Sequence, residues 1–126
     1  MKKSVGVYFS GNIVYKFKPI GMSIESSNNI TFDKNVVGHI HERASKANPE
    51  EYLVDTRCGI CMCSIGFEAM DKCRDLHITD NIVAGAAMSA YTVIGSDCTT
   101  AETDLFRGNI AHSVYGSTGG IGALIY

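Results

Sequence analysis

The sequence predicts a single α+β domain, residues 1–126, in which a mainly antiparallel sheet carries helices packed on one face. Three observations lead to this fold class. Segments rich in β-branched and aromatic residues lie at both ends of the chain, as strands would. Apolar residues at the helical spacing of three and four lie mainly between them. A length of 126 residues, with 45% hydrophobic and 19% charged residues, is that of one ordinary globular domain.

The N-terminal segment has the pattern of a β-hairpin. Val5–Phe9 and Ile13–Phe17 are rich in β-branched and aromatic residues, and a short Ser-Gly-Asn segment separates them. Two such runs around a short glycine-containing turn predict a hairpin with one buried face. Pro19 is expected to end the second strand, because proline cannot donate to a strand ladder. A further short strand is expected at Ile30–Phe32.

Helices are expected in the middle of the chain. Capping residues precede the helical candidates, for example Asp33 before the first. The longest apolar stripe follows Thr79 or Asp80 and is closed by Gly95, a typical residue just past a helix end. The expected helices cover roughly Lys34–Ala47, Phe67–Leu76, Asn81–Ile94 and Ala101–Phe106.

Three more strands complete the predicted domain. Arg57–Gly66 is apolar with two glycines, which favours a strand buried on both faces. Ile110–Tyr115 and Ile121–Tyr126 are apolar runs around the loop Gly116–Gly120, and they are expected to pair with the N-terminal hairpin. No internal repeat is expected.

Charge and composition disfavour several classes of protein. The net charge is −2, with 11 basic and 13 acidic residues, so the chain lacks the basic footprint typical of nucleic-acid binding. No window of about 18 apolar residues exists, so no membrane span is expected. The run after Met1 reads as a strand rather than as a signal peptide. Five cysteines, an odd number, indicate free thiols and a cytoplasmic, reducing setting.

The cysteines leave three interpretations open. Cys58, Cys61 and Cys63 lie in the apolar run, and Cys73 with His77 follows at a helical spacing. Core packing is the favoured interpretation, since free cysteine behaves as a small hydrophobe. Zinc binding and redox chemistry are the alternatives, but a single C-x-x-C is only half of a zinc site. We therefore predict no metal site and no cofactor.

A ligand site is predicted around the C-terminal glycine-rich loop. Converging backbone N–H groups and two hydroxyls suit a phosphate or carboxylate, and arginines can add charge-assisted contacts. An ordinary turn between paired strands is the alternative. The predicted ligand-binding residues are Arg57, Phe106, Arg107, Asn109, Ser117, Thr118, Gly119 and Gly120.

The segment Ile110–Gly119, with the pattern Ile-Ala-x-Ser-x-Tyr-Gly-x-x-Gly, resembles part of the HutP family of histidine-responsive RNA antiterminators. The resemblance covers about a tenth of the chain. It implies an α+β ligand-binding hexamer. The family's metal-binding histidine pair at i and i+4 has no match here, so no metal or RNA residues are taken from it.

The resulting hypothesis is a non-enzymatic homo-oligomer that senses or sequesters a small anionic or nucleotide-like molecule. No catalytic residues are predicted under this hypothesis. One alternative is a cysteine-dependent enzyme that uses Cys98, which lies at a predicted helix start where a thiol pKa is lowered. Another alternative is a ligand-responsive RNA-binding regulator.

Overall fold

The computed structural model describes residues 5–16, 21–24, 28–38, 58–62, 74–86, 89–93, 105–114 and 121–125. Within these ranges every regular element is a short strand, and the strands form three parallel sheets. The predicted α+β class is therefore wrong, because the described residues contain no helix and no antiparallel pairing.

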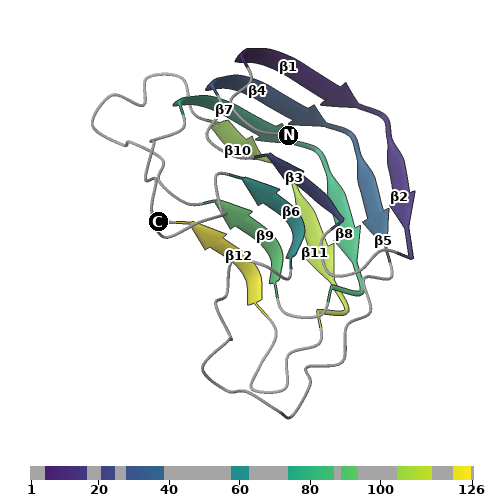
Figure 1. The fold of residues 1–126 in the computed structure, drawn as a ribbon. Coiled ribbons are helices and arrows are strands. Elements are labelled where there is room, and N and C mark those ends of the chain that lie inside the picture. The colour runs from purple at the N-terminus through teal and green to yellow at the C-terminus, as the bar shows by residue number, and fades with distance from the viewer. Residues whose placement is uncertain are drawn as a thin grey trace, which may run out of the picture.

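The chain visits the three sheets in turn and makes this circuit four times (Figure 1). The first sheet consists of β1 (Val5–Ser10), β4 (Asn28–Asp33), β7 (Arg74–Thr79) and β10 (Leu105–Arg107). The second sheet consists of β2 (Ile13–Tyr15), β5 (Val36–Gly38), β8 (Ile82–Ala84) and β11 (Ile110–His112). The third sheet consists of β3 (Met22–Ile24), β6 (Cys58–Met62), β9 (Ser89–Val93) and β12 (Ile121–Ile125).

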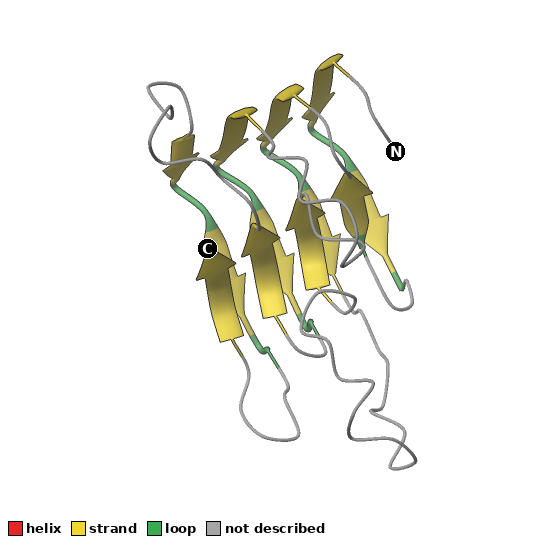
Figure 2. Ribbon diagram, turned by 60° about the vertical axis from the view of Figure 1, so that its left-hand side comes forward, coloured by secondary structure: helices red, strands yellow, loops and turns green. Residues whose placement is uncertain are grey.

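Each circuit is one coil of a parallel β-solenoid. Coil 1 contains β1–β3, coil 2 contains β4–β6, coil 3 contains β7–β9 and coil 4 contains β10–β12. Every strand pairs in parallel with its counterpart in the next coil, so the coils stack as Figure 2 shows. Coils 2 and 3 are covered on both sides by a neighbouring coil and are called the inner coils. Among the described strands, coils 1 and 4 each have a neighbouring coil on one side only, and they are called the end coils.

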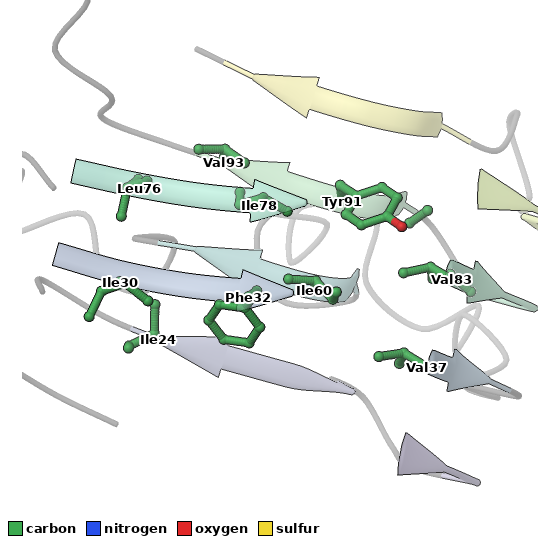
Figure 3. Close-up of a cluster of buried hydrophobic side chains, with 12 residues drawn as sticks. Ile24, Ile30, Phe32, Val37, Ile60, Leu76, Ile78, Val83, Tyr91 and Val93 are labelled. Carbon is green, nitrogen blue, oxygen red and sulfur yellow. The ribbon is translucent and has the colours of Figure 1, made fainter. Parts of the chain in front are cut away.

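The core fills the space enclosed by the three sheets (Figure 3). Inward-facing residues of counterpart strands stack on one another, and Phe9 lies on Phe32 with ring centroids 4.9 Å apart. Tyr91 enters from the third sheet, and its hydroxyl lies 2.8 Å from the carbonyl of Asn81 and 2.9 Å from that of Ile110. Burial raises the pKa of this phenol, so it remains a hydrogen-bond donor. The described apolar residues that are at most 2% exposed are Ile24, Ile30, Phe32, Val37, Cys58, Ile60, Cys61, Leu76, Ile78, Val83, Ala86, Ala90 and Tyr91.

A two-residue corner joins the first sheet to the second in every coil. Its first residue has a positive φ, and its second residue is asparagine. Glycine, or a polar residue that tolerates the left-handed region, is needed at the first position. The corners are Gly11-Asn12 (φ 65° at the glycine), Lys34-Asn35 (φ 53°), Asp80-Asn81 (φ 54°) and Gly108-Asn109 (φ 67°).

The four corner asparagines form a ladder that runs from coil to coil. The Oδ1 of Asn81 accepts hydrogen bonds from the backbone N–H and the Nδ2 of Asn35, both at 2.9 Å. The Nδ2 of Asn81 donates to Oδ1 of Asn109 and to the carbonyl oxygen of Phe32, again at 2.9 Å. The same pattern links Asn12 to Asn35. Because Asn35 and Asn81 are fully buried, the ladder satisfies polar groups that water cannot reach.

This topology corrects the predicted hairpin and the predicted pairing of the terminal strands. β1 and β2 were expected to pair across Ser10-Gly11-Asn12, but that segment turns the chain into a different sheet. β11 and β12 also belong to different sheets, and each pairs with coil 3. The glycine and asparagine that predict a hairpin turn serve here as a corner.

The predicted helices are likewise wrong wherever the structure describes them. β5 begins inside Lys34–Ala47, and β7, β8 with β9, and β10 occupy described parts of the other three. In Asn81–Ile94, apolar residues recur every three or four positions because two strands of three and five residues follow one another in different sheets. Residues such as Val83 and Ala90 face the same core from two different sheets, which imitates the spacing of a helix.

The structure also reveals an internal repeat that the sequence analysis did not predict. An aromatic or aliphatic residue, two further residues, asparagine and a β-branched residue recur in each coil. Counterpart positions are unequally spaced, since Ile13, Val36, Ile82 and Ile110 pair in order with steps of 23, 46 and 28 residues. A search for a fixed period therefore misses them.

Candidate binding face

The outer surface of the second sheet is the candidate site. Strand residues alternate between the core and the solvent, so β2, β5, β8 and β11 each present two residues outward. Val14, Val37 and Val83 face inward, and their neighbours face outward. We call the outward set the apolar face: Ile13, Tyr15, Val36, Gly38, Ile82, Ala84, Ile110 and His112.

One row of this face is aliphatic in all four coils. Ile13 is 79% exposed, Ile110 is 53% exposed and Val36 is 39% exposed, while Ile82 is half-buried. Each of them follows a corner asparagine, and the parallel register places them side by side. Strands in a sheet are about 4.8 Å apart, so the row extends for roughly 14 Å along the solenoid.

The second row of the apolar face is formed by Tyr15 and its counterparts. Tyr15 lies over Gly38, and a Cβ at that glycine would be 3.5 Å from the ring. Lys16 follows β2, and its ammonium lies 5.5 Å from the centroid of the Tyr15 ring. In the two inner coils this position is held by small residues, Gly38 and Ala84. Their side chains therefore project less far from the sheet than those of the aliphatic row.

The apolar face contains no Asp, Glu, Lys or Arg, and neither does any other position of the four strands. Exposed strand edges and faces of natural proteins commonly carry charge to prevent unwanted contacts. A contiguous apolar surface without charges is typical of an interaction site. Exposure of this apolar surface to water is therefore unfavourable in free energy.

The outer surface of the first sheet differs by a polar group centred on Asp33, beside the exposed side chains of Tyr8 and Leu105. The Asp33 carboxylate accepts a hydrogen bond from Thr79 Oγ1 at 2.7 Å and pairs with Lys34 Nζ at 3.1 Å. The hydroxyl of Tyr8 lies 3.5 Å from the same carboxylate. The Thr79 hydrogen bond, and next the Lys34 hydrogen bond, hold the pKa of Asp33 below its usual value. Asp33 is therefore a carboxylate whose acceptor positions are already engaged, and it is a poor proton acceptor.

The structure describes three of the predicted ligand-binding residues, and all three belong to coil 4. Phe106 faces the core, where its ring meets that of Tyr91 edge-on at 5.4 Å. Asn109 is a member of the ladder and also donates to the carbonyl of Ile78 at 2.7 Å. Arg107 is exposed at the end of β10. Arg57, Ser117, Thr118, Gly119 and Gly120 lie outside the described residues, so the anion site at the loop stays a prediction.

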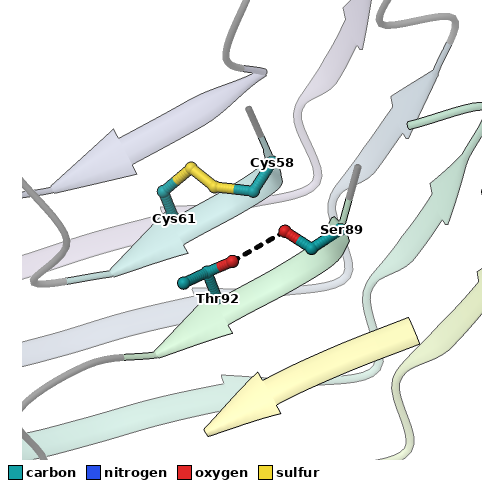
Figure 4. The surroundings of a disulfide bond; sticks show 4 residues. All are labelled: Cys58, Cys61, Ser89 and Thr92. Carbon is teal, nitrogen blue, oxygen red and sulfur yellow. Dashed lines mark hydrogen bonds between the residues drawn. A yellow bond between two sulfur atoms is a disulfide. The ribbon is translucent and has the colours of Figure 1, made fainter. Parts of the chain in front are cut away.

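The cysteine interpretation is corrected at one pair. Cys58 and Cys61 are joined in a disulfide within β6, with their Cα atoms 5.7 Å apart, instead of being free thiols. Both are fully buried, as core packing predicts. In the next coil Ser89 and Thr92 hold the paired positions, and their hydroxyls are 2.7 Å apart (Figure 4).

The remaining cysteine predictions fall on other parts of the chain. Cys63, Cys73 and Cys98 lie outside the described residues. Among the residues the structure does describe, no three His, Cys, Asp or Glu side chains gather closely enough to hold a metal ion.

Sequence reasoning missed the apolar face, although a signal for it was present. Four of the five Asn-Ile or Asn-Val pairs of the sequence mark the corners and the first outward residue of the second sheet, and two of these four follow a glycine. Taken singly, each pair has the residues of a turn or of a helix start, and only its recurrence indicates a solenoid corner.

Comparison with known proteins adds no relative: no protein-family model, no curated protein and no solved structure matches the chain. The resemblance to the HutP family accordingly stays untested. In the part of the chain that the structure describes, no helix has the length and apolarity needed to cross a membrane.

Proposed function

We propose that this protein is a non-enzymatic binding module whose apolar face binds the apolar surface of a protein partner. One observation carries the proposal. All four coils present a β-branched aliphatic residue at the same outward position, in a sheet whose twelve strand residues include no Asp, Glu, Lys or Arg. The homo-oligomer expected from the sequence is one way to cover this face.

Strand propensity alone does not account for the aliphatic row. β-Branched residues are favoured in strands, but threonine meets that preference and is compatible with water. The first sheet uses this option, because Thr31 is an outward residue of β4 in the same coil as Val36. Burying one valine or isoleucine side chain completely is worth about 1.5–3 kcal/mol, so covering the row on binding is favourable.

The contrast with the first sheet supports binding over acid–base chemistry. Asp33 is held by Thr79 and Lys34, and its lowered pKa keeps it ionised at neutral pH. Such a group stabilises the coil contact. The alternatives of a Cys98 enzyme, an anion site at Gly116–Gly120 and RNA binding concern residues beyond the described ranges and stay predictions.

The test is selection of peptides from a random display library on the immobilised protein. Val36→Lys places a charge in the middle of the aliphatic row. Thr31→Lys is the matched control, because it adds the same charge on the outer surface of the first sheet in the same coil. We expect enriched peptides with alternating apolar residues, which can lie along the row as an extended segment.

The selected peptides should bind wild type and Thr31→Lys equally and should bind Val36→Lys at least about tenfold more weakly, a difference of about 1.4 kcal/mol. Circular dichroism and thermal melting establish that each variant is folded. Equal affinity for all three proteins, or no enrichment on wild type, would overturn the proposal.

A further inference from the structure

The asparagine ladder is directional, and its two ends are chemically complementary. In the interior each corner asparagine accepts at Oδ1 from the preceding coil and donates from its own N–H and Nδ2 to Oδ1 of the following coil. The ladder therefore ends in an unused acceptor on one side and unused donors on the other.

Coil 1 ends the ladder with an acceptor. The Oδ1 of Asn12 accepts no hydrogen bond within the described part of the chain, whereas Oδ1 of Asn35 accepts two. Coil 4 ends it with donors. The backbone N–H of Asn109 has no acceptor among the described residues, and one Nδ2 hydrogen remains after the bond to Ile78. In the inner coils these same groups are paired at 2.9–3.0 Å.

The side chains around the two ladder ends are also matched. Phe9 and Phe106 occupy counterpart inward positions, and both are exposed to some degree on the open side of their coil. One face of the Phe9 ring already stacks on Phe32. Phe106 of another copy would stack in the same way on the opposite face of Phe9. On the outside, Ser10 and Arg107 are counterparts, so at this described position the junction places an arginine beside a serine and not beside a like charge.

We propose that coil 4 of one copy stacks on coil 1 of a second copy, so that the asparagine ladder continues from copy to copy. The N–H and Nδ2 of Asn109 then donate to Oδ1 of Asn12 in the neighbouring copy. Open strand edges are templates for this kind of pairing. Because the two surfaces differ, the contact is head to tail, and repeating it gives linear assemblies instead of a closed dimer. This inference uses the coil ends and does not depend on the apolar face.

A positive charge added at the junction, and then compensated by a negative charge on the other side, tests the proposal. In the stacked register, Arg107 lies beside Ser10 of the next copy. Ser10→Arg places two arginines side by side there, while within its own chain the new arginine lies beside Asp33 and is tolerated. Like charges directly opposite in a sheet are destabilising, so Ser10→Arg should weaken association about fivefold. The double variant Ser10→Arg with Arg107→Glu places opposite charges at the junction and should restore it.

Sedimentation velocity over a range of protein concentrations, at low and high salt, measures the association of wild type and both variants. Electron microscopy shows whether the assemblies are linear. Val36→Lys, whose charge is on the apolar face and away from the coil ends, should associate end to end like wild type. A loss of association in Val36→Lys that spares Ser10→Arg would place self-association on the apolar face and overturn this inference.

Wild type that stays monomeric up to millimolar concentration would also overturn the inference. So would wild type that associates while Ser10→Arg matches it at low salt. Neither result would bear on peptide binding at the apolar face, so the two proposals fail separately.

Discussion

The inner coils and the end coils share the same corner chemistry, yet they differ in how much of it is buried. Asn35 and Asn81 in the inner coils are fully buried, whereas Asn12 in coil 1 is exposed and Asn109 is half-buried. The inward residues follow the same trend, from Val37 and Val83 at 0% exposure to Ala111 in coil 4, which is exposed. The same corner motif thus shapes every coil. The contribution of its asparagine to the free energy of unfolding depends on whether neighbouring coils bury it.

The largest effect is expected when an inner asparagine is removed. Asn81→Ala leaves the backbone N–H of Asn35 and the carbonyl of Phe32 without their partners in a place that water does not reach. Unsatisfied buried groups cost about 1–3 kcal/mol each, so the free energy of unfolding should fall by about 3–5 kcal/mol. Urea unfolding followed by circular dichroism measures this change.

Asn12→Ala is the end-coil control for that experiment. Asn12 Nδ2 donates to Oδ1 of Asn35, but that oxygen keeps the hydrogen bond from the Asn12 backbone N–H. The expected loss is about 0.5–1.5 kcal/mol. If both variants lost the same stability, burial would not distinguish the inner coils from the end coils.

A glycine pair provides the next largest contrast. Gly59 in β6 and Gly122 in β12 occupy equivalent places in an inner coil and an end coil. A Cβ at Gly59 would overlap Val83 Cγ1 and lie 2.7 Å from the carbonyl oxygen of Ala90, so Gly59→Ala should cost about 1–3 kcal/mol. At Gly122 the nearest contact is Ala111 Cβ at 3.9 Å, and Gly122→Ala should stay within about 0.5 kcal/mol of wild type.

Thermal melting of the two alanine variants, side by side with wild type, checks this pair. A Gly59→Ala protein as stable as wild type would mean that β6 can move away from β8 without loss.

The smallest effect is a pH dependence at the boundary between the two inner coils, where Asp33 of coil 2 meets Thr79 of coil 3. The pKa of Asp33 is lowered in the folded protein, mainly by the Thr79 hydrogen bond, from an ordinary 3.8. Its contribution to stability is therefore fully present above pH 3.8 and is lost as the pH falls through the lower folded value. In Asp33→Asn the acid part of the stability curve should be flatter than in wild type.

Melting temperatures from pH 7 down to pH 2 provide the measurement for Asp33. Thr79→Val removes the largest cause of the lowered pKa, so its destabilisation by acid should be smaller than in wild type, with an acid arm that lies between those of wild type and Asp33→Asn. A constant difference between wild type and Asp33→Asn at every pH would contradict the assignment.

The sequence predicted where several strands lie but not how they pair. Val5–Phe9, Ile30–Phe32 and the start of the Arg57–Gly66 run were confirmed as strands, because β-branched and aromatic residues report a local preference. Pairing is non-local, and a Gly-Asn corner has the same residues as a hairpin turn. The positive φ at Lys34 and Asp80 was also not predicted, because neither residue type indicates that conformation as glycine does.

The candidate site was out of reach for a related reason. Ile82 was assigned to a helix stripe, where an isoleucine would be buried, and its outward position follows only from the parallel register with Val36 and Ile110. From the sequence, Phe106 is predicted as a stacking surface for the ligand and Asn109 as a further ligand contact. The structure uses them for core packing and for the ladder.

The unequal steps between counterpart residues have a consequence for how such a chain can change. From Val36 to Ile82 the chain runs twice as far as from Ile13 to Val36, yet the ladder bonds on either side of Asn35 have nearly the same length. For a flexible segment, doubling the length costs only on the order of 0.6 kcal/mol of closure entropy. Insertions between corners are therefore cheap, and new surface can be added to one coil by gene-level insertion or by grafting a foreign peptide while the stack keeps its register.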